Sequence, residues 1–125
     1  MQFEEITEYV EVQDTKENLF VKSNLWLVDA FNDAEAVTQY SDKEAGVIAG
    51  KYVIDSSGLN SMYNLKAVIK IFIQNNRARI SIYPLPFTGY TGYGSTSDRF
   101  KDAVIKDVQN LIENYEYYIS KTKLL

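Results

Sequence analysis

Histidine and cysteine, the side chains that most often carry catalysis and metal binding, are both absent from this chain of 125 residues. Without imidazole there is no Ser-His or Cys-His pair, no histidine ligand for zinc and no histidine pH switch. Without cysteine there is no thiolate nucleophile and no disulfide. The candidates that remain are a glycine-rich loop, several acids and one basic, aromatic face of a predicted sheet.

The glycine-rich loop precedes the last predicted helix and reads Gly89-Tyr90-Thr91-Gly92-Tyr93-Gly94-Ser95-Thr96. Backbone amides at such a helix start can bind phosphate. However, a P-loop needs Gly-Lys-Ser/Thr, and a Rossmann loop needs a parallel strand before it. We therefore interpret the segment as a turn-forming loop. The alternative is a ligand loop in which Tyr90 and Tyr93 stack on a sugar or a peptide.

The acids gather near the start of the chain and around residues 29–35: Glu4, Glu5, Glu8, Glu11, Asp29, Asp33 and Glu35. Carboxylate catalysis needs two such groups at a defined separation in space, which sequence spacing does not fix. The loop 55–60 only partly matches a calcium-binding loop. We interpret these acids as solvated surface charge and expect no catalytic residue, no metal and no cofactor. A small hydrolase that uses carboxylates or a bound cation is the alternative function.

The clearest strand pair joins residues 65–74 to residues 77–84 through Asn75-Asn76. Asparagine tolerates the left-handed conformation that a two-residue hairpin needs, so the turn sets the register. That register predicts an apolar face on which Ile73 meets Ala78, Ile71 meets Ile80 and Ile69 meets Ile82. The opposite face then carries Lys70, Phe72, Arg79 and Tyr83, with Lys66 and Arg77 nearby.

Basic and aromatic side chains on a sheet are typical of nucleic-acid platforms. Against this stand the formal net charge of −4 and the pI near 4.8, since a protein that binds phosphate backbones usually presents a basic surface. We expect this face to be solvated or covered by a partner rather than by nucleic acid, and a nucleic-acid-binding sheet is the less favoured of the alternative functions.

The first predicted helix starts at Asp14-Thr15-Lys16-Glu17, where an acid follows three residues after a capping side chain. One stripe of this helix should cover the sheet: Leu19, Phe20, Ser23, Trp26, Leu27, Ala30 and Phe31. A second apolar stripe lies nearly opposite and consists of Val21, Leu25 and Val28. Either a neighbouring helix covers this second stripe, or it contacts another subunit or a partner protein.

Three more strands are predicted at residues 3–12, 36–42 and 46–54, with Gly46 supplying the positive φ of the turn after Asp42. A final helix, capped by Ser95 or Ser97, should run to about Ile119, followed by a frayed tail at 120–125. The order is strand, helix, four strands, helix. This order predicts one α+β domain over residues 1–125, a five-stranded antiparallel sheet with both helices on one face.

These residues resemble a bacterial family, the domain of unknown function 4468, which has a TBP-like fold. The resemblance rests on Trp26 and Phe31, on the stretch 37–40, on the turn 42–46, on residues 48–51 and on the strand after Asn75-Asn76-Arg77. It implies the same order of elements. It also implies frequent export behind a leader, and it brings no catalytic residues.

We therefore expect a non-catalytic binding or interaction domain. The two compartments that fit the sequence are the bacterial cell envelope and the cytoplasm. Its contacts, with a protein partner or a second copy, would use the second helix stripe or the outer sheet face. Residues 1–5 are acidic where a signal peptide is basic. The envelope therefore requires a leader trimmed before Met1. No run is long enough to span a membrane.

Overall fold

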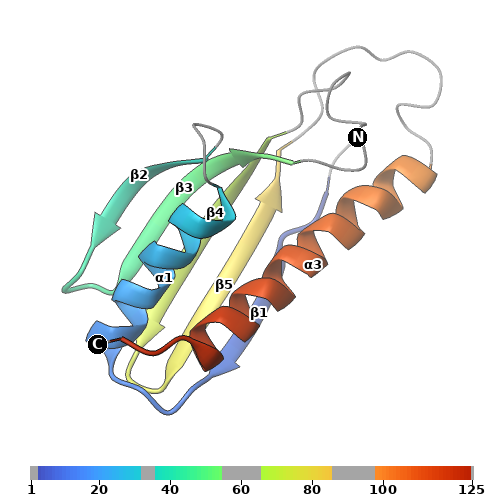
Figure 1. The fold of residues 1–125 in the computed structure, drawn as a ribbon. Coiled ribbons are helices and arrows are strands. Elements are labelled where there is room, and N and C mark those ends of the chain that lie inside the picture. Colours follow the sequence, from blue (N-terminus) through green and yellow to red (C-terminus); the bar gives the residue numbers. More distant parts are fainter. Residues whose placement is uncertain (1–2, 32–35, 55–65, 86–97, 125) are drawn as a thin grey trace.

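The computed structural model describes residues 3–31, 36–54, 66–85 and 98–124. For residues 36–39 and 98–100 it describes the backbone alone. Within these ranges, five strands and two helices follow one another in the predicted order (Figure 1). They are β1 (Ile6–Glu11), α1 (Lys16–Ala30), β2 (Ala36–Asp42), β3 (Val47–Val53), β4 (Lys66–Gln74), β5 (Arg77–Pro84) and α3 (Asp98–Lys121). The α+β class predicted from the sequence is confirmed.

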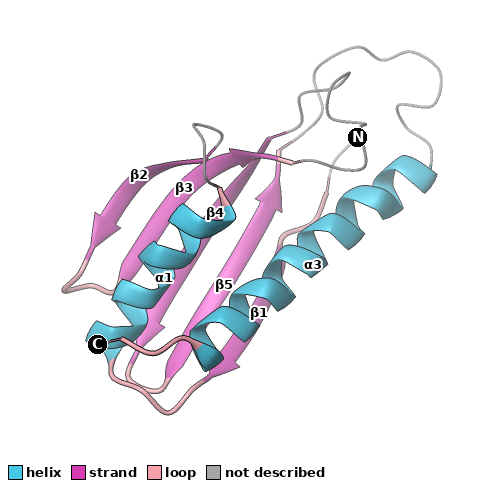
Figure 2. Ribbon diagram, in the orientation of Figure 1, coloured by secondary structure: helices cyan, strands magenta, loops and turns pink. Residues whose placement is uncertain are grey.

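All neighbouring strands are antiparallel, and their order across the sheet is β1-β5-β4-β3-β2. The first strand therefore pairs with the last one, and β2 forms the opposite edge. Both helices lie on the same face of the sheet, α1 over β4 and α3 along β1 (Figure 2). The other face, which we call the outer face, carries no helix of the described residues (Figure 2).

The β4–β5 hairpin has the predicted register, with Ile73 opposite Ala78 and Ile71 opposite Ile80. Asn76 adopts φ 65°, the left-handed conformation that the turn requires. Gly46 likewise adopts φ 72° in the β2–β3 turn, so both turns were read correctly from their residue types.

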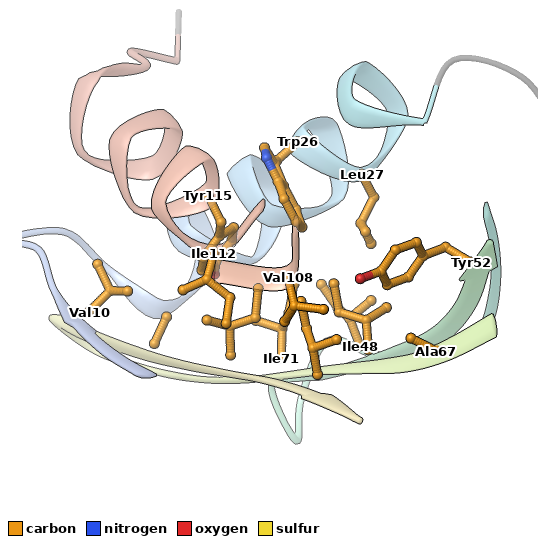
Figure 3. Close-up of a cluster of buried hydrophobic side chains, with 14 of the residues drawn as sticks. Val10, Trp26, Leu27, Ile48, Tyr52, Ala67, Ile71, Val108, Ile112 and Tyr115 are labelled. Atoms are coloured by element: carbon orange, nitrogen blue, oxygen red, sulfur yellow. The ribbon is translucent and has the colours of Figure 1, made fainter. Parts of the chain in front are cut away.

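The core lies between the helices and the inner face of the sheet (Figure 3). Isoleucines from β4 and β5 form its floor, and each is at most 3% exposed: Ile69, Ile71, Ile73, Ile80 and Ile82. Trp26 of α1 sets its ring edge against Tyr115 of α3, with the ring centroids 4.8 Å apart. Burying one isoleucine contributes about 1.5–3 kcal/mol, so the five isoleucines of the floor stabilise the fold substantially.

The ends of the helices differ slightly from the prediction. Thr15 caps α1 by accepting a hydrogen bond of 3.1 Å from the Asn18 amide. Ala30, predicted on the buried stripe, is exposed because α1 ends there. The final helix runs to Lys121, two residues past the predicted end, and the Thr122 amide still donates to the Tyr118 carbonyl oxygen at 2.9 Å. The predicted caps Ser95 and Ser97 lie outside the described residues.

Candidate functional site

The outer face of the β4–β5 hairpin holds the side chains that the sequence singled out. Alternation places Lys70 and Phe72 of β4 on the same face as Arg79 and Tyr83 of β5. Lys70 is exposed, and the other three are half-buried by their neighbours on the face. The hairpin therefore presents this predicted set together, away from the core.

Pairing with β1 adds a residue that sequence reasoning did not connect with this face. Tyr9 lies directly opposite Arg79, which in turn lies opposite Phe72. The three side chains form one row across β1, β5 and β4, and Tyr9 is 55% exposed. Tyr9 alternates with the buried Val10 in the sequence, so its outward direction was readable, but its neighbours were not.

Two guanidinium groups in this area rest on aromatic rings. The Arg79 guanidinium lies 4.3 Å from the centroid of the Phe72 ring, and that of Arg77 lies 4.9 Å from the Tyr9 ring. Such cation–π contacts hold a flexible arginine in one place, at about 0.5–1 kcal/mol each on an exposed surface. The four side chains line a hollow of about 400 Å³, and Gln74 also contributes to its lining.

The outer face is basic although the chain as a whole is acidic. The outward positions of the five strands carry five cations and two carboxylates: Lys51, Lys66, Lys70, Arg77, Arg79, Glu11 and, at the β2 edge, Asp42. The net charge of the whole chain is −4. The charges are therefore segregated, so the sheet presents a positive surface while the rest of the molecule is negative.

Within the described residues, the arginines of the hollow have few acidic neighbours. The Arg77 guanidinium lies 3.7 Å from a Glu11 carboxylate oxygen, and both side chains are well exposed. An exposed pair of this kind contributes about 0–1 kcal/mol. No carboxylate in the described part of the chain lies within ion-pair distance of Arg79. A hydrogen-bonding anion could therefore bind here without displacing a strong internal partner.

A comparison with protein-family models matches residues 7–87 to DUF4468, a domain of unknown function with TBP-like fold. The matched segment runs from β1 to the end of β5 and covers well over half of the chain. The chain belongs to this family. The resemblance read from the sequence is thereby confirmed.

Solved structures agree with the DUF4468 assignment. A TBP-like protein from Parabacteroides distasonis superimposes with a TM-score of 0.71 at 15% identity, over 95% of this chain and 94% of that one. A DUF4468 family protein from Bacteroides ovatus gives a TM-score of 0.64 at 11% identity, over 95% of this chain and 86% of that one. At such identities the likeness establishes the fold alone. A search of curated protein sequences gives no match.

The second helix stripe of this DUF4468 domain is exposed in the structure. Val21, Leu25 and Val28 are 41%, 42% and 65% exposed. The helix α3 packs instead against the side of α1 that carries Ser23 and Trp26. A neighbouring helix was one of the two predicted covers for this stripe, and α3 does not fill that role.

Three carboxylates converge on a second hollow, between β1 and α3. Glu8, Glu113 and Glu116 line it, and its volume is about 480 Å³. Partial burial, and then repulsion by the other two carboxylates, raises the pKa of the Glu116 carboxyl. Among the described residues, no three His, Cys, Asp or Glu side chains are arranged to hold a metal ion.

Other predicted features of the DUF4468 chain fall elsewhere. Tyr90 and Tyr93 of the proposed ligand loop lie outside the described residues, as does the oxygen-rich loop at 55–60. In the part of the chain that the structure describes, no helix is both long and apolar enough to cross a membrane.

Sequence reasoning also missed a buried charge, Lys22 of α1, which is 7% exposed. Its ammonium group lies 2.6 Å from an Asp14 carboxylate oxygen, in the segment that joins β1 to α1. The hydrogen bond from Lys22 is the largest cause of the lowered pKa of the Asp14 carboxyl. The spacing of eight residues spans the loop and two helix turns, so no local pattern signals this pair.

Proposed function

We propose that this chain is a non-catalytic binding domain, and that the outer face of its sheet is the surface that binds a negatively charged ligand. The observation that carries the proposal is the segregation of charge: the strands place five cations and two carboxylates on this face in a chain of net charge −4. Positive surfaces attract anionic partners and raise the rate of encounter. The absence of histidine and cysteine supports a role in binding rather than in catalysis.

The geometry of the face supports the same proposal. Neither of the two helices that the structure describes covers it (Figure 2), so its side chains are available to a partner. Its aromatic rings offer apolar area beside the charges, a composition that favours recognition surfaces. The hollow between Tyr9 and Phe72 gives the face a concave element.

A nuclear magnetic resonance titration tests this proposal. Poly-L-glutamate, heparin and a single-stranded oligonucleotide serve as anionic probes at low salt, and poly-L-lysine serves as the cationic control. We expect at least one anionic probe to change the amide chemical shifts of β4 and β5, and these changes should grow with the concentration of the probe. The proposal fails if none of the anionic probes shifts amides of the outer face, or if poly-L-lysine shifts them as strongly.

We extend the proposal to the cell envelope as the compartment. Its support is the family resemblance, because members of the family are often exported. Fractionation of cells that express the gene from its own upstream sequence tests this extension. Recovery of the protein only in the cytoplasmic fraction contradicts it and leaves the proposed binding face untouched.

The alternative function is a small carboxylate-dependent hydrolase, and one observation favours it. Glu8, Glu113 and Glu116 share a hollow, and the raised pKa of Glu116 is a property of general acids. A panel of chromogenic glycosides and esters tests it. Turnover that Glu116→Gln abolishes, while the matched surface change Glu17→Gln does not, would replace our proposal with this one.

A further inference from the structure

We propose that the hollow on the outer face binds a carboxylate side chain of an acidic, extended polypeptide, held by Arg77 and Arg79. This inference rests on the proposed function and names the chemical class of its ligand. The two arginines occupy successive outward positions of β5, about 7 Å apart along the strand. Both line the same hollow, whose volume of about 400 Å³ is ample for one carboxylate and its stem.

Each guanidinium group is already oriented. Arg79 lies over Phe72 and Arg77 lies over Tyr9, with distances of 4.3 and 4.9 Å to the ring centroids. A guanidinium that stacks on a ring keeps the N–H groups of its edge free, and these match the two oxygens of a carboxylate. Because stacking has already ordered the side chains, less conformational entropy is lost when the ligand binds.

The hollow already has one carboxylate neighbour within the chain. Glu11 pairs with Arg77 at 3.7 Å, and its side chain is 75% exposed. Such a pair is long and weak, so an incoming carboxylate can compete with it. Arg79 has no ion-pair partner in the described segments, so it supplies the stronger unsatisfied attraction.

The remaining cations favour an extended ligand with more than one acid. Lys70 of β4 lies one strand over and two residues along from Arg79, and Lys51 of β3 lies one strand over and two residues along from Lys70. Strand geometry makes each such step about 8 Å. Side chains on one edge of an extended peptide repeat every ~7 Å, so alternate acids can follow these charges across the face.

The same face is poorly suited to nucleic acid. The rings of Phe72 and Tyr9 that would stack on bases are covered by guanidinium groups. The sheet bends toward the helices on the side of β3 and β2, which makes the outer face convex there (Figure 3). A convex surface cannot wrap a duplex, and the net charge of −4 repels a long polyanion. A short acidic peptide avoids both difficulties.

Fluorescence anisotropy with a labelled peptide that alternates glutamate and serine tests the inference. The peptide with glutamine in place of glutamate and a single-stranded oligonucleotide of equal charge are the comparison probes. We expect Arg79→Gln to weaken binding of the acidic peptide about tenfold or more. Glu11→Gln should strengthen it about two- to threefold, since it removes the internal competitor. Lys106→Gln, an exposed change on α3, is the matched control and should change affinity by less than about twofold.

Two further outcomes separate this inference from the proposed function. If Lys51→Gln and Lys66→Gln weaken peptide binding while Arg79→Gln does not, the face binds anions but the hollow is not the site. If the oligonucleotide binds more tightly than the peptide, the ligand class is wrong and the binding face stands. If no acidic probe binds at all, both proposals fail.

A circular dichroism spectrum and a urea midpoint equal to those of the parent protein show that Arg79→Gln still folds. Arg79→Lys that binds like the parent would show that charge alone suffices, which overturns the role of the oriented guanidinium.

Discussion

Asn76 and Asp14 are joined by two backbone-directed hydrogen bonds. The amide of Asn76 donates to the carbonyl oxygen of Asp14 at 2.8 Å, and the Asn76 Oδ1 accepts from the Asp14 amide at 3.0 Å. Asn75 adds a third bond, since its Oδ1 accepts from the Lys16 amide at 2.8 Å. The β4–β5 turn therefore holds the segment that leads from β1 into α1.

The Asn76 position gives the first prediction. Asn76→Ala should lower the free energy of unfolding by about 2 kcal/mol, because it loses the side-chain hydrogen bond and strains the left-handed backbone. Asn76→Gly keeps the backbone conformation free and should cost about 1 kcal/mol. Urea unfolding measures both changes. Equal stabilities for the two variants would show that backbone conformation contributes nothing here.

The second prediction concerns the close approach of Gly46 to β4. A Cβ at this residue would lie 2.4 Å from the carbonyl oxygen of Ile73, and φ is 72°. Gly46→Ala should therefore cost about 2 kcal/mol or more in thermal or urea unfolding. The neighbouring change Ala45→Gly, at an exposed position of the same turn, should cost about 0.5 kcal/mol or less. A Gly46→Ala variant as stable as Ala45→Gly would contradict the close packing of this turn.

Acid stability gives the third prediction. The hydrogen bond from Lys22 holds the pKa of the Asp14 carboxyl below its usual value near 4. Below that usual value the folded protein binds fewer protons at Asp14 than the unfolded chain does. The stabilisation is therefore present at neutral pH and is lost as the pH falls through the lowered pKa.

Lys22→Met removes the main cause of this shift. It should lower stability at neutral pH by about 1–3 kcal/mol and flatten the loss of stability between about pH 5 and pH 2. Urea unfolding at a series of pH values measures both effects. An acid slope identical to that of the parent protein would mean that the pair does not shift Asp14.

Two buried tyrosines give the fourth prediction. The Tyr115 hydroxyl lies 2.7 Å from the Ser23 hydroxyl in the core, whereas the Tyr52 hydroxyl has no hydrogen-bond partner among the described residues. Burial raises the pKa of both phenols. Tyr115→Phe should cost about 1–2 kcal/mol because Ser23 is left unpaired in the core. Tyr52→Phe should change stability by about 0.5 kcal/mol at most. A reversed order of these two costs in urea unfolding would contradict the hydrogen-bond assignment.

The fifth prediction compares two leucines of α1. Leu27 is 9% exposed and Leu25 is 42% exposed. Leu27→Asp should destabilise by about 3 kcal/mol or more because it buries a charge, whereas Leu25→Asp should change stability by about 0.5 kcal/mol. If the stripe of Val21, Leu25 and Val28 contacts a second copy, Leu25→Asp also lowers the mass seen by light scattering. A parent protein that is strictly monomeric, with mass and solubility that Leu25→Asp leaves unchanged, would remove this stripe as a contact between copies.

The sequence by itself determined the local structure and much of one surface. Residue types at Asn76 and Gly46 specified both turns, because only residues that tolerate positive φ fit there. The register of the β4–β5 hairpin then followed, since its period of two assigns every side chain to one face. This alternation is sufficient to place four side chains together on the outer face: Lys70, Phe72, Arg79 and Tyr83.

Only the tertiary structure decided which distant segments meet. Pairing of β1 with β5 brings Tyr9 beside Arg79 and completes the hollow, although the two residues are separated by most of the chain. The buried pair of Lys22 and Asp14 and the convergence of Glu8 with Glu113 and Glu116 arise in the same way. Turn and alternation signals act over a few neighbouring residues. Contacts between distant segments depend instead on how whole elements pack to bury the core, which no short stretch of sequence records.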